Sequence, residues 1–236
     1  ARALQAAVDK LIATPSEAAL AEARDAWRVA RAPYQQSEVF RFGNPIVDEW
    51  EGRVNSWPLD EGLIDYVDAS YAESGENPLA MLNVIASPAI EIAGEAVDAS
   101  LITPGLIATK LHGADGLDAN VASGYHAIEF LLWGQDLNGT DAGAGNRPFT
   151  DFVTGADCTG GNCDRRVAYL QAATDLLVSD LEEMAKAWEA DGAARAAVEA
   201  DPNAGLLAIL TGMGSLSYGE LAGERMKLGL LLNDPE

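Results

Sequence analysis

The stretch DRRVAYLQAATDLLVSDLEEMAKAWEA, residues 164–190, decides the fold class. Its apolar side chains recur at steps of three, four and seven residues, which is the spacing of one face of an α-helix. The stretch is therefore predicted to form one long amphipathic helix. The apolar positions that carry this pattern are Val167, Leu170, Leu177, Leu181, Met184 and Trp188.

Three further segments are predicted to be helical. Residues 16–42 form the first, with Ser16 as N-cap and Gly43 at the end, and residues 117–134 form the second. Residues 204–232 form a glycine-rich third, in which the small residues permit close helix approach or leave room for a ligand. No stretch shows the convincing period-2 alternation of a strand. The sequence therefore predicts an all-α protein.

The composition restricts the class of partner. The 236 residues include 37 Asp and Glu against 15 Lys and Arg, which gives a formal charge of −22, and 48% are apolar, as in a globular protein. Such a chain repels nucleic acid and anionic membranes, and it favours cations, metals or neutral ligands. No apolar run reaches the roughly 18–20 uninterrupted residues of a membrane span.

The two cysteines, Cys158 and Cys163, enclose the short sequence TGGN at the end of a glycine-rich loop, residues 135–163. Because the glycines permit a tight turn, the two thiols can form a disulfide. A disulfide indicates an oxidising compartment such as a periplasm. The alternative is a pair of free thiols in a cytosolic protein.

The segment GYHAIE, residues 124–129, carries the main candidate site. His126 and Glu129 are three residues apart, so both project from one helix face and could ligate one cation. Gly124 would leave space beside them. The alternative is that the pair only forms a hydrogen bond and orders the core. The second histidine, His112, is predicted to be a surface residue.

Other acids in apolar or aromatic surroundings could complete a metal site. We expect the further ligands to come from Glu38, Asp60 and Glu224. The remaining residues of the predicted pocket are Arg41, Trp57, Glu220 and Arg225.

The stretch GYHAIEFLLWGQD resembles the GxHxxE signature of the imelysin family, which comprises peptidase-like and iron-regulated proteins of bacterial envelopes. The blocks AWRVARAPYQQSEVFRFG, NSWPLDEGLIDYV, NRPFTDF and SYGELAGERM resemble family blocks in family order, over roughly residues 20–230. The resemblance implies an all-α fold of two up-and-down helical-bundle halves. It also implies a periplasmic or outer-membrane-attached location and a link to iron uptake.

The expected division is an N-terminal bundle with the GxHxxE helix at 1–134, the disulfide-bearing loop at 135–163 and a C-terminal half at 164–236. Family members commonly continue past GERM into a stretch with Ser, Asp and His residues. We therefore expect the second half to be truncated and the site to be incomplete. A start at Ala1 without Met is expected of a processed or trimmed chain.

Three functions are compatible with these residues. A zinc peptidase needs about three protein ligands, an open position and a base, whereas HxxE supplies two ligands and HExxH is absent. Carboxylates with one imidazole suit an iron ion. The first hypothesis is therefore metal binding, with iron favoured over zinc, in uptake alongside other envelope proteins of that process. The alternatives are a metal-dependent endopeptidase using the same pocket and a non-catalytic ligand-binding module.

Overall fold

A computed structural model describes residues 1–73, 77–139 and 141–227. Contacts divide the chain into two compact units, each built from two separate stretches. The first unit comprises Ala1–Ala30 and Arg53–Asp180, and the second comprises Arg31–Gly52 and Leu181–Glu236. The three consecutive segments expected from the sequence remain a prediction.

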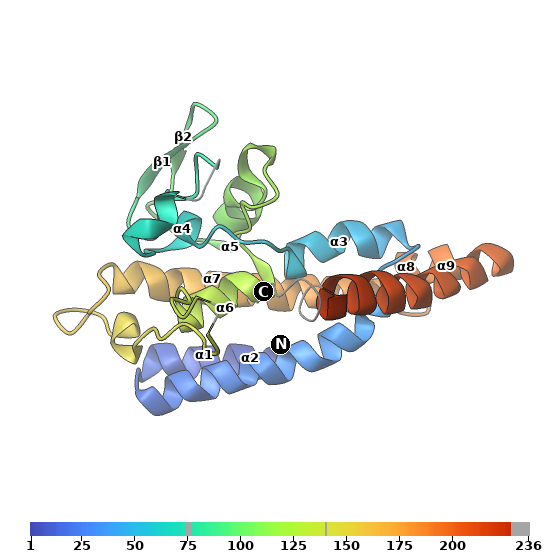
Figure 1. Cartoon of the computed structure of the whole chain (residues 1–236), viewed down its shortest axis with the longest axis horizontal. Coiled ribbons are helices and arrows are strands. Elements are labelled where there is room, and N and C mark those ends of the chain that lie inside the picture. Colours follow the sequence, from blue (N-terminus) through green and yellow to red (C-terminus); the bar gives the residue numbers. More distant parts are fainter. Residues whose placement is uncertain (74–76, 140, 228–236) are drawn as a thin grey trace. The chain divides into compact units, whose positions relative to one another are not determined.

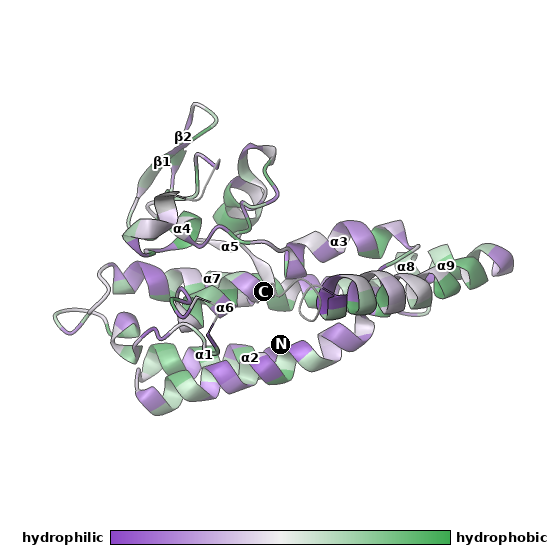
Figure 2. Ribbon diagram, viewed as in Figure 1, coloured by the Kyte–Doolittle hydropathy of each residue, from purple (hydrophilic) through white to green (hydrophobic). Residues whose placement is uncertain are grey.

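The structure is dominated by helices, as the sequence predicts (Figure 1). Figure 2 shows hydrophobic and hydrophilic residues interleaved along α1, α2 and α7, as expected for helices with one buried face. No helix within the described ranges is long and apolar enough to cross a membrane. The helices are α1 (Arg2–Ala13), α2 (Glu17–Ser37), α3 (Pro45–Asn55), α4 (Glu61–Ile64), α5 (Pro104–Leu106), α6 (Gly124–Trp133), α7 (Cys163–Ala187), α8 (Ala193–Glu199) and α9 (Pro202–Gly214).

The described residues also include helices of other types. Four are 3₁₀ helices, η1 (Glu38–Phe40), η2 (Ala69–Glu73), η4 (Ala114–Gly116) and η5 (Phe149–Phe152). Two are π-helices, η3 (Ile107–Leu111) and η6 (Ser215–Lys227).

The long helices form for the reasons read from the sequence. The hydroxyl of Ser16 accepts a hydrogen bond from the backbone N–H of Ala19 at 3.2 Å, so α2 has its expected N-cap. Helix α7 begins one residue before the predicted segment and ends three residues before its end. It buries Leu170, Leu177 and Met184 of the predicted apolar stripe.

The glycine-rich C-terminal segment is helical as far as the structure describes it, with α9 followed by η6. A Cβ on Gly205 would lie 2.1 Å from the carbonyl oxygen of Val198, and one on Gly212 would lie 2.2 Å from that of Val39. Close approach of backbone therefore requires glycine at these two positions. Residues 228–232 of the predicted helix lie outside the described residues.

The helix that carries His126 begins later than predicted. The sequence predicts a start at residue 117, whereas α6 begins at Gly124. The preceding residues form a turn that Asn120 holds, because its buried side chain donates to the Ala114 carbonyl at 2.7 Å and its own carbonyl accepts from the N–H of Gly113. Such local hydrogen bonds compete successfully with a helix.

A small β-hairpin, which the sequence pattern did not indicate, accompanies the helices. Strands β1 (Ala89–Ile92) and β2 (Glu95–Asp98) form an antiparallel hairpin in the first unit (Figure 1). The turn residues Ala93 and Gly94 both have positive φ, the geometry that joins two strands through two residues. Each strand spans only four residues, so the alternation is too short to stand out in the sequence.

Candidate functional site

His126 and Glu129 lie together on α6 in the first unit, as their spacing predicts. The Nδ1 atom of His126 is 2.9 Å from Oε2 of Glu129, and the two side chains are 18% and 40% exposed. The indole ring of Trp57 lies 4.9 Å from the imidazole, measured between ring centroids. When Nδ1 carries the proton it donates to Glu129, and Nε2 then presents its lone pair to another partner.

The start of α6 is held by contacts with α3 and α2. Gly124 has φ +83°, and a Cβ on it would lie 2.5 Å from the carbonyl oxygen of Val54. The hydroxyl of Ser123 donates to the Arg53 carbonyl at 2.9 Å. The indole N–H of Trp27 donates to the carbonyl of Tyr125, also at 2.9 Å. Backbone therefore fills the space that the sequence assigned to a ligand, and Gly124 serves close packing.

A residue missing from the predicted site, Glu61, lies in the same electrostatic environment. It begins α4, which packs against α6. The pKa of Glu61 is raised to about 7, with burial as the largest cause; the charge of Arg147 opposes the rise, and those of Asp136 and Glu129 add to it. Burial is therefore the main reason that Glu61 resists ionisation beside α6. The position of Glu61 directly after Asp60 was the only sequence signal for it.

Asp60 has partners of its own. Its carboxylate is 3.3 Å from the hydroxyl of Tyr71 and accepts a hydrogen bond from the side-chain amide of Asn77. Its backbone N–H donates to the Ala119 carbonyl at 2.9 Å. These bonds fix the turn before α4, so Asp60 is engaged locally.

Four of the other predicted residues form an ion-pair cluster in the second unit. Nη2 of Arg225 is 3.4 Å from Oε2 of the buried Glu38, and Nη2 of Arg41 is 3.5 Å from Oε1 of Glu220. Glu224, by contrast, is exposed on η6. In the ranges that the structure describes, no group of three His, Cys, Asp or Glu side chains is placed to hold a metal ion.

His112 is not the surface residue that the sequence predicts. It is half-buried, and its Nδ1 accepts a hydrogen bond from the N–H of Ala122 at 3.3 Å and lies 3.1 Å from the hydroxyl of Ser123. Its imidazole therefore orders the segment that leads into α6. The glycine and alanine residues around it in the sequence gave no indication of this contact.

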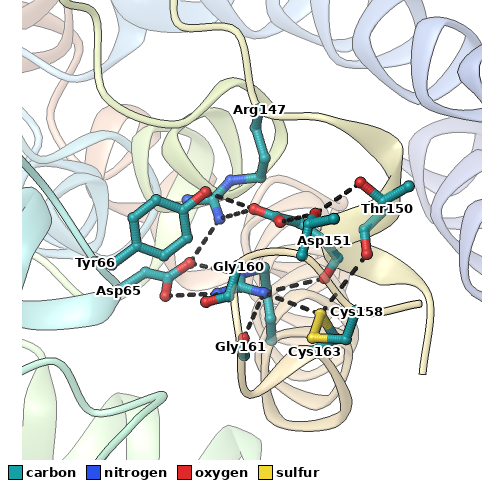
Figure 3. The surroundings of a disulfide bond; sticks show 11 residues. Asp65, Tyr66, Arg147, Thr150, Asp151, Cys158, Gly160, Gly161 and Cys163 are labelled. Atoms are coloured by element: carbon teal, nitrogen blue, oxygen red, sulfur yellow. Dashed lines mark hydrogen bonds and ion pairs between the residues drawn. A yellow bond between two sulfur atoms is a disulfide. The ribbon is translucent and has the colours of Figure 1, made fainter. Parts of the chain in front are cut away.

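The predicted disulfide between Cys158 and Cys163 is present, and it closes the loop immediately before α7 (Figure 3). Arg166 follows on the first turn of α7. Its Nη1 donates to the carbonyls of Asp151 and Gly161, each at 3.0 Å. The disulfide therefore ends the glycine-rich loop at the point where Arg166 ties that loop to the helix.

A buried ion network that the sequence did not suggest adjoins this loop (Figure 3). Asp65 accepts from Nε and Nη2 of Arg166 at 2.6 and 3.0 Å, and its Oδ2 is 2.8 Å from Nη1 of Arg147. Asp151 accepts from Arg147 at 3.1 Å and from the Tyr66 hydroxyl at 2.6 Å. Burial disfavours the charged form of Asp151, but the hydrogen bonds and the two arginines outweigh it and lower its pKa. Two arginines and two aspartates thus balance their charges.

Comparison with known proteins adds three findings. The imelysin family profile matches residues 1–236. Iron-regulated protein A of Synechococcus elongatus is 34% identical over 74 residues, which is 31% of this chain and 21% of that protein. A crystal structure described as an iron-regulated protein A precursor of Parabacteroides distasonis is 24% identical, with a TM-score of 0.54. That match covers 91% of this chain and 49% of the solved chain, so this chain spans about half the length of a relative with the same fold.

Proposed function

Because the chain belongs to the imelysin family, we propose that it is an iron-related member that binds an iron ion through His126 and Glu129. The ion is cargo for uptake, and the working location is the periplasm or the outer membrane surface. The disulfide supports this location, since disulfides persist in oxidising compartments. Other envelope proteins of iron uptake would deliver or receive the ion.

The observation that carries this proposal is the bond between Nδ1 of His126 and Oε2 of Glu129. A carboxylate in this position fixes the orientation of the imidazole, so that Nε2 can ligate a metal. Both side chains are partly exposed, so an ion can reach them. The carboxylate of Glu129 adds attraction for a cation.

The donor set suits capture better than catalysis. One imidazole with carboxylates is chemistry that iron accepts. A hydrolytic metal centre needs about three protein ligands and a base. In the described residues Glu129 orients one donor, Nε2 of His126, and a further carboxylate ligand would come from Glu61 as the ion binds. A cargo ion that is bound only temporarily needs fewer protein ligands than a resident hydrolytic metal ion.

The experiment is an anaerobic titration with ferrous ion, followed by calorimetry and by metal analysis. His126→Ala is expected to weaken binding by at least about tenfold, because it removes a proposed ligand. Glu91→Gln, at an exposed acid on β1, is the control and should bind iron as the wild type does. Equal metal content in the wild type and His126→Ala would overturn the proposal.

The same variants separate the alternatives. If the pair only orders the structure, His126→Ala and Glu129→Ala should lower the melting temperature and leave iron binding unchanged. If the protein is a metal-dependent endopeptidase, it should cleave an unfolded protein in a chelator-sensitive reaction that Glu129→Ala abolishes. Cleavage of that kind would replace the uptake proposal with the enzymatic one.

A further inference from the structure

The second unit contains a cavity of about 470 Å³ that the iron proposal does not use. Its volume falls within the range of roughly 300–1,000 Å³ that is typical of small-molecule sites. The walls come from the end of α2, from η1, from α3 and from the end of α7. The larger apolar and aromatic residues of the lining include Tyr34, Phe40, Val47, Trp50, Met184 and Trp188.

Aromatic rings form two pairs in this lining. The centroids of Phe40 and Trp188 are 5.7 Å apart, and those of Tyr34 and Trp50 are 6.5 Å apart. Tyr34 and Trp50 are buried, whereas Phe40 is 55% exposed, so the aromatic wall extends from the interior to the surface. Aromatic faces carry negative charge density and attract cations, most strongly where water is excluded.

One carboxylate in the lining lacks a full set of partners. The side chain of Glu38 is only 5% exposed, and its Oε1 atom is buried with no hydrogen-bond partner among the described residues. Its Oε2 atom is 3.4 Å from Arg225, whose side chain is 46% exposed and therefore well hydrated. A buried carboxylate with one long contact to a hydrated cation retains a strong demand for a positively charged donor.

The other charged groups do not meet this demand. Arg41 also lines the cavity, but its guanidinium lies 3.3 to 3.5 Å from the carboxylates of Asp48, Glu51 and Glu220. The charged residues of the lining are thus two acids, Glu38 and Glu51, against one arginine. The net charge of the cavity lining is therefore negative.

The hydroxyl of Tyr34 is affected by the same negative charge. Burial raises the pKa of Tyr34, and the carboxylates of Glu51 and Glu38 raise it further. The hydroxyl is 3.4 Å from Oε1 of Glu51. Tyr34 therefore stays a neutral phenol in the wall of the cavity, with the guanidinium of Arg31 5.5 Å from the centroid of its ring.

We propose that this cavity binds a protonated organic amine with an apolar body. The rings of Tyr34, Trp50 and Trp188 surround the body, and the ammonium group donates to Glu38. The apolar body would displace water from the aromatic wall of the cavity, and the ammonium group would donate to Oε1 of Glu38, which lacks a hydrogen-bond partner among the described residues. The proposal is independent of iron binding, because His126 and Glu129 do not line the cavity.

The test is calorimetric titration with three probes of nearly equal shape and different charge. The probes are phenethylamine, neutral 2-phenylethanol and anionic 3-phenylpropanoate. The amine should bind the wild-type protein at least about tenfold more tightly than either of the others, since only it supplies a cationic donor. Equal binding of the three, preference for the carboxylate or no binding of the amine at millimolar concentration would each overturn the proposal.

A matched pair of variants locates the binding. Glu38→Gln preserves the shape of the side chain and removes its charge, so it should weaken amine binding about tenfold and leave 2-phenylethanol unaffected. Glu49→Gln makes the same change on the exposed side of α3 and should have no effect. A Glu38→Gln protein with wild-type amine affinity would overturn the proposal. The probe series on the wild-type protein remains decisive if Glu38→Gln fails to fold.

Discussion

Nδ1 of His126 and Oε2 of Glu129 are hydrogen-bonded at 2.9 Å on α6, which leaves Nε2 as the ring nitrogen for a metal. We therefore expect Glu129→Ala to weaken ferrous-ion binding by about 10- to 100-fold, because the imidazole loses its orienting carboxylate. Calorimetry under anaerobic conditions measures the change, and Glu91→Gln, at an exposed acid of β1, is the control. Unchanged affinity in Glu129→Ala would show that Glu129 takes no part in binding.

The shared carboxylate of Asp65 should matter more for stability than for binding. Asp65→Asn removes the negative charge between Arg147 and Arg166, both of which are fully buried. Removal of one partner from a buried ion network costs about 3–5 kcal/mol, so the free energy of unfolding in urea should fall by that order. Asp118→Asn, at an exposed position, should change it by less than about 0.5 kcal/mol. A cost for Asp65→Asn as small as that of the control would contradict the importance of the network.

The disulfide should contribute less to the free energy of unfolding than the ion network around Asp65 does. Replacement of Cys158 and Cys163 by serine frees the end of the loop in the unfolded state, and closure of a short loop is worth about 2–3 kcal/mol. The variant should therefore unfold at lower urea concentration than the oxidised wild type. Its urea midpoint should be close to that of the wild type measured in the presence of reductant. If reductant leaves the midpoint of the wild type unaltered, the disulfide does not stabilise the fold.

The raised pKa of Glu61 predicts that the stability of the fold depends on pH. Its pKa in the folded protein is raised to about 7 from an ordinary value of 4.5, with burial as the largest cause. Below pH 4.5 the carboxyl is neutral in both states, and between 4.5 and 7 the unfolded state ionises first, so folding stability falls as the pH rises. Glu61→Gln removes this loss and should be more stable than the wild type at pH 8, by up to about 3 kcal/mol, but not at pH 4.5.

Melting curves from pH 4.5 to 8 measure this difference. Other carboxyl groups titrate over part of the same range, so the informative quantity is the wild type minus Glu61→Gln at each pH. Glu91→Gln should follow the wild type throughout. A constant difference between the wild type and Glu61→Gln across the range would mean that the pKa of Glu61 is not raised.

Elements whose signal is local were predictable. Helix α7 follows from the spacing of its own apolar residues, and the disulfide follows from two cysteines that four residues separate. The pairing of His126 with Glu129 is equally local, since residues three apart share a helix face. In these cases the sequence window contains all the interacting groups.

Features that depend on distant residues were not predictable. Asp65 and Arg166 are 101 residues apart, and neither position signals the other. The pKa of Glu61 depends on Asp136, Glu129 and Arg147, which come from separate segments. The start of α6 was misjudged because the bonds of Asn120 favour a turn over an otherwise acceptable helix.

The most direct test of iron binding is a crystal of this chain soaked anaerobically with ferrous ion, with diffraction data collected at the iron absorption edge. We predict an anomalous peak within bonding distance of Nε2 of His126, and loss of that peak in His126→Ala crystals treated identically. The absence of a peak beside His126 in the wild type, or its persistence in His126→Ala, would contradict the assignment.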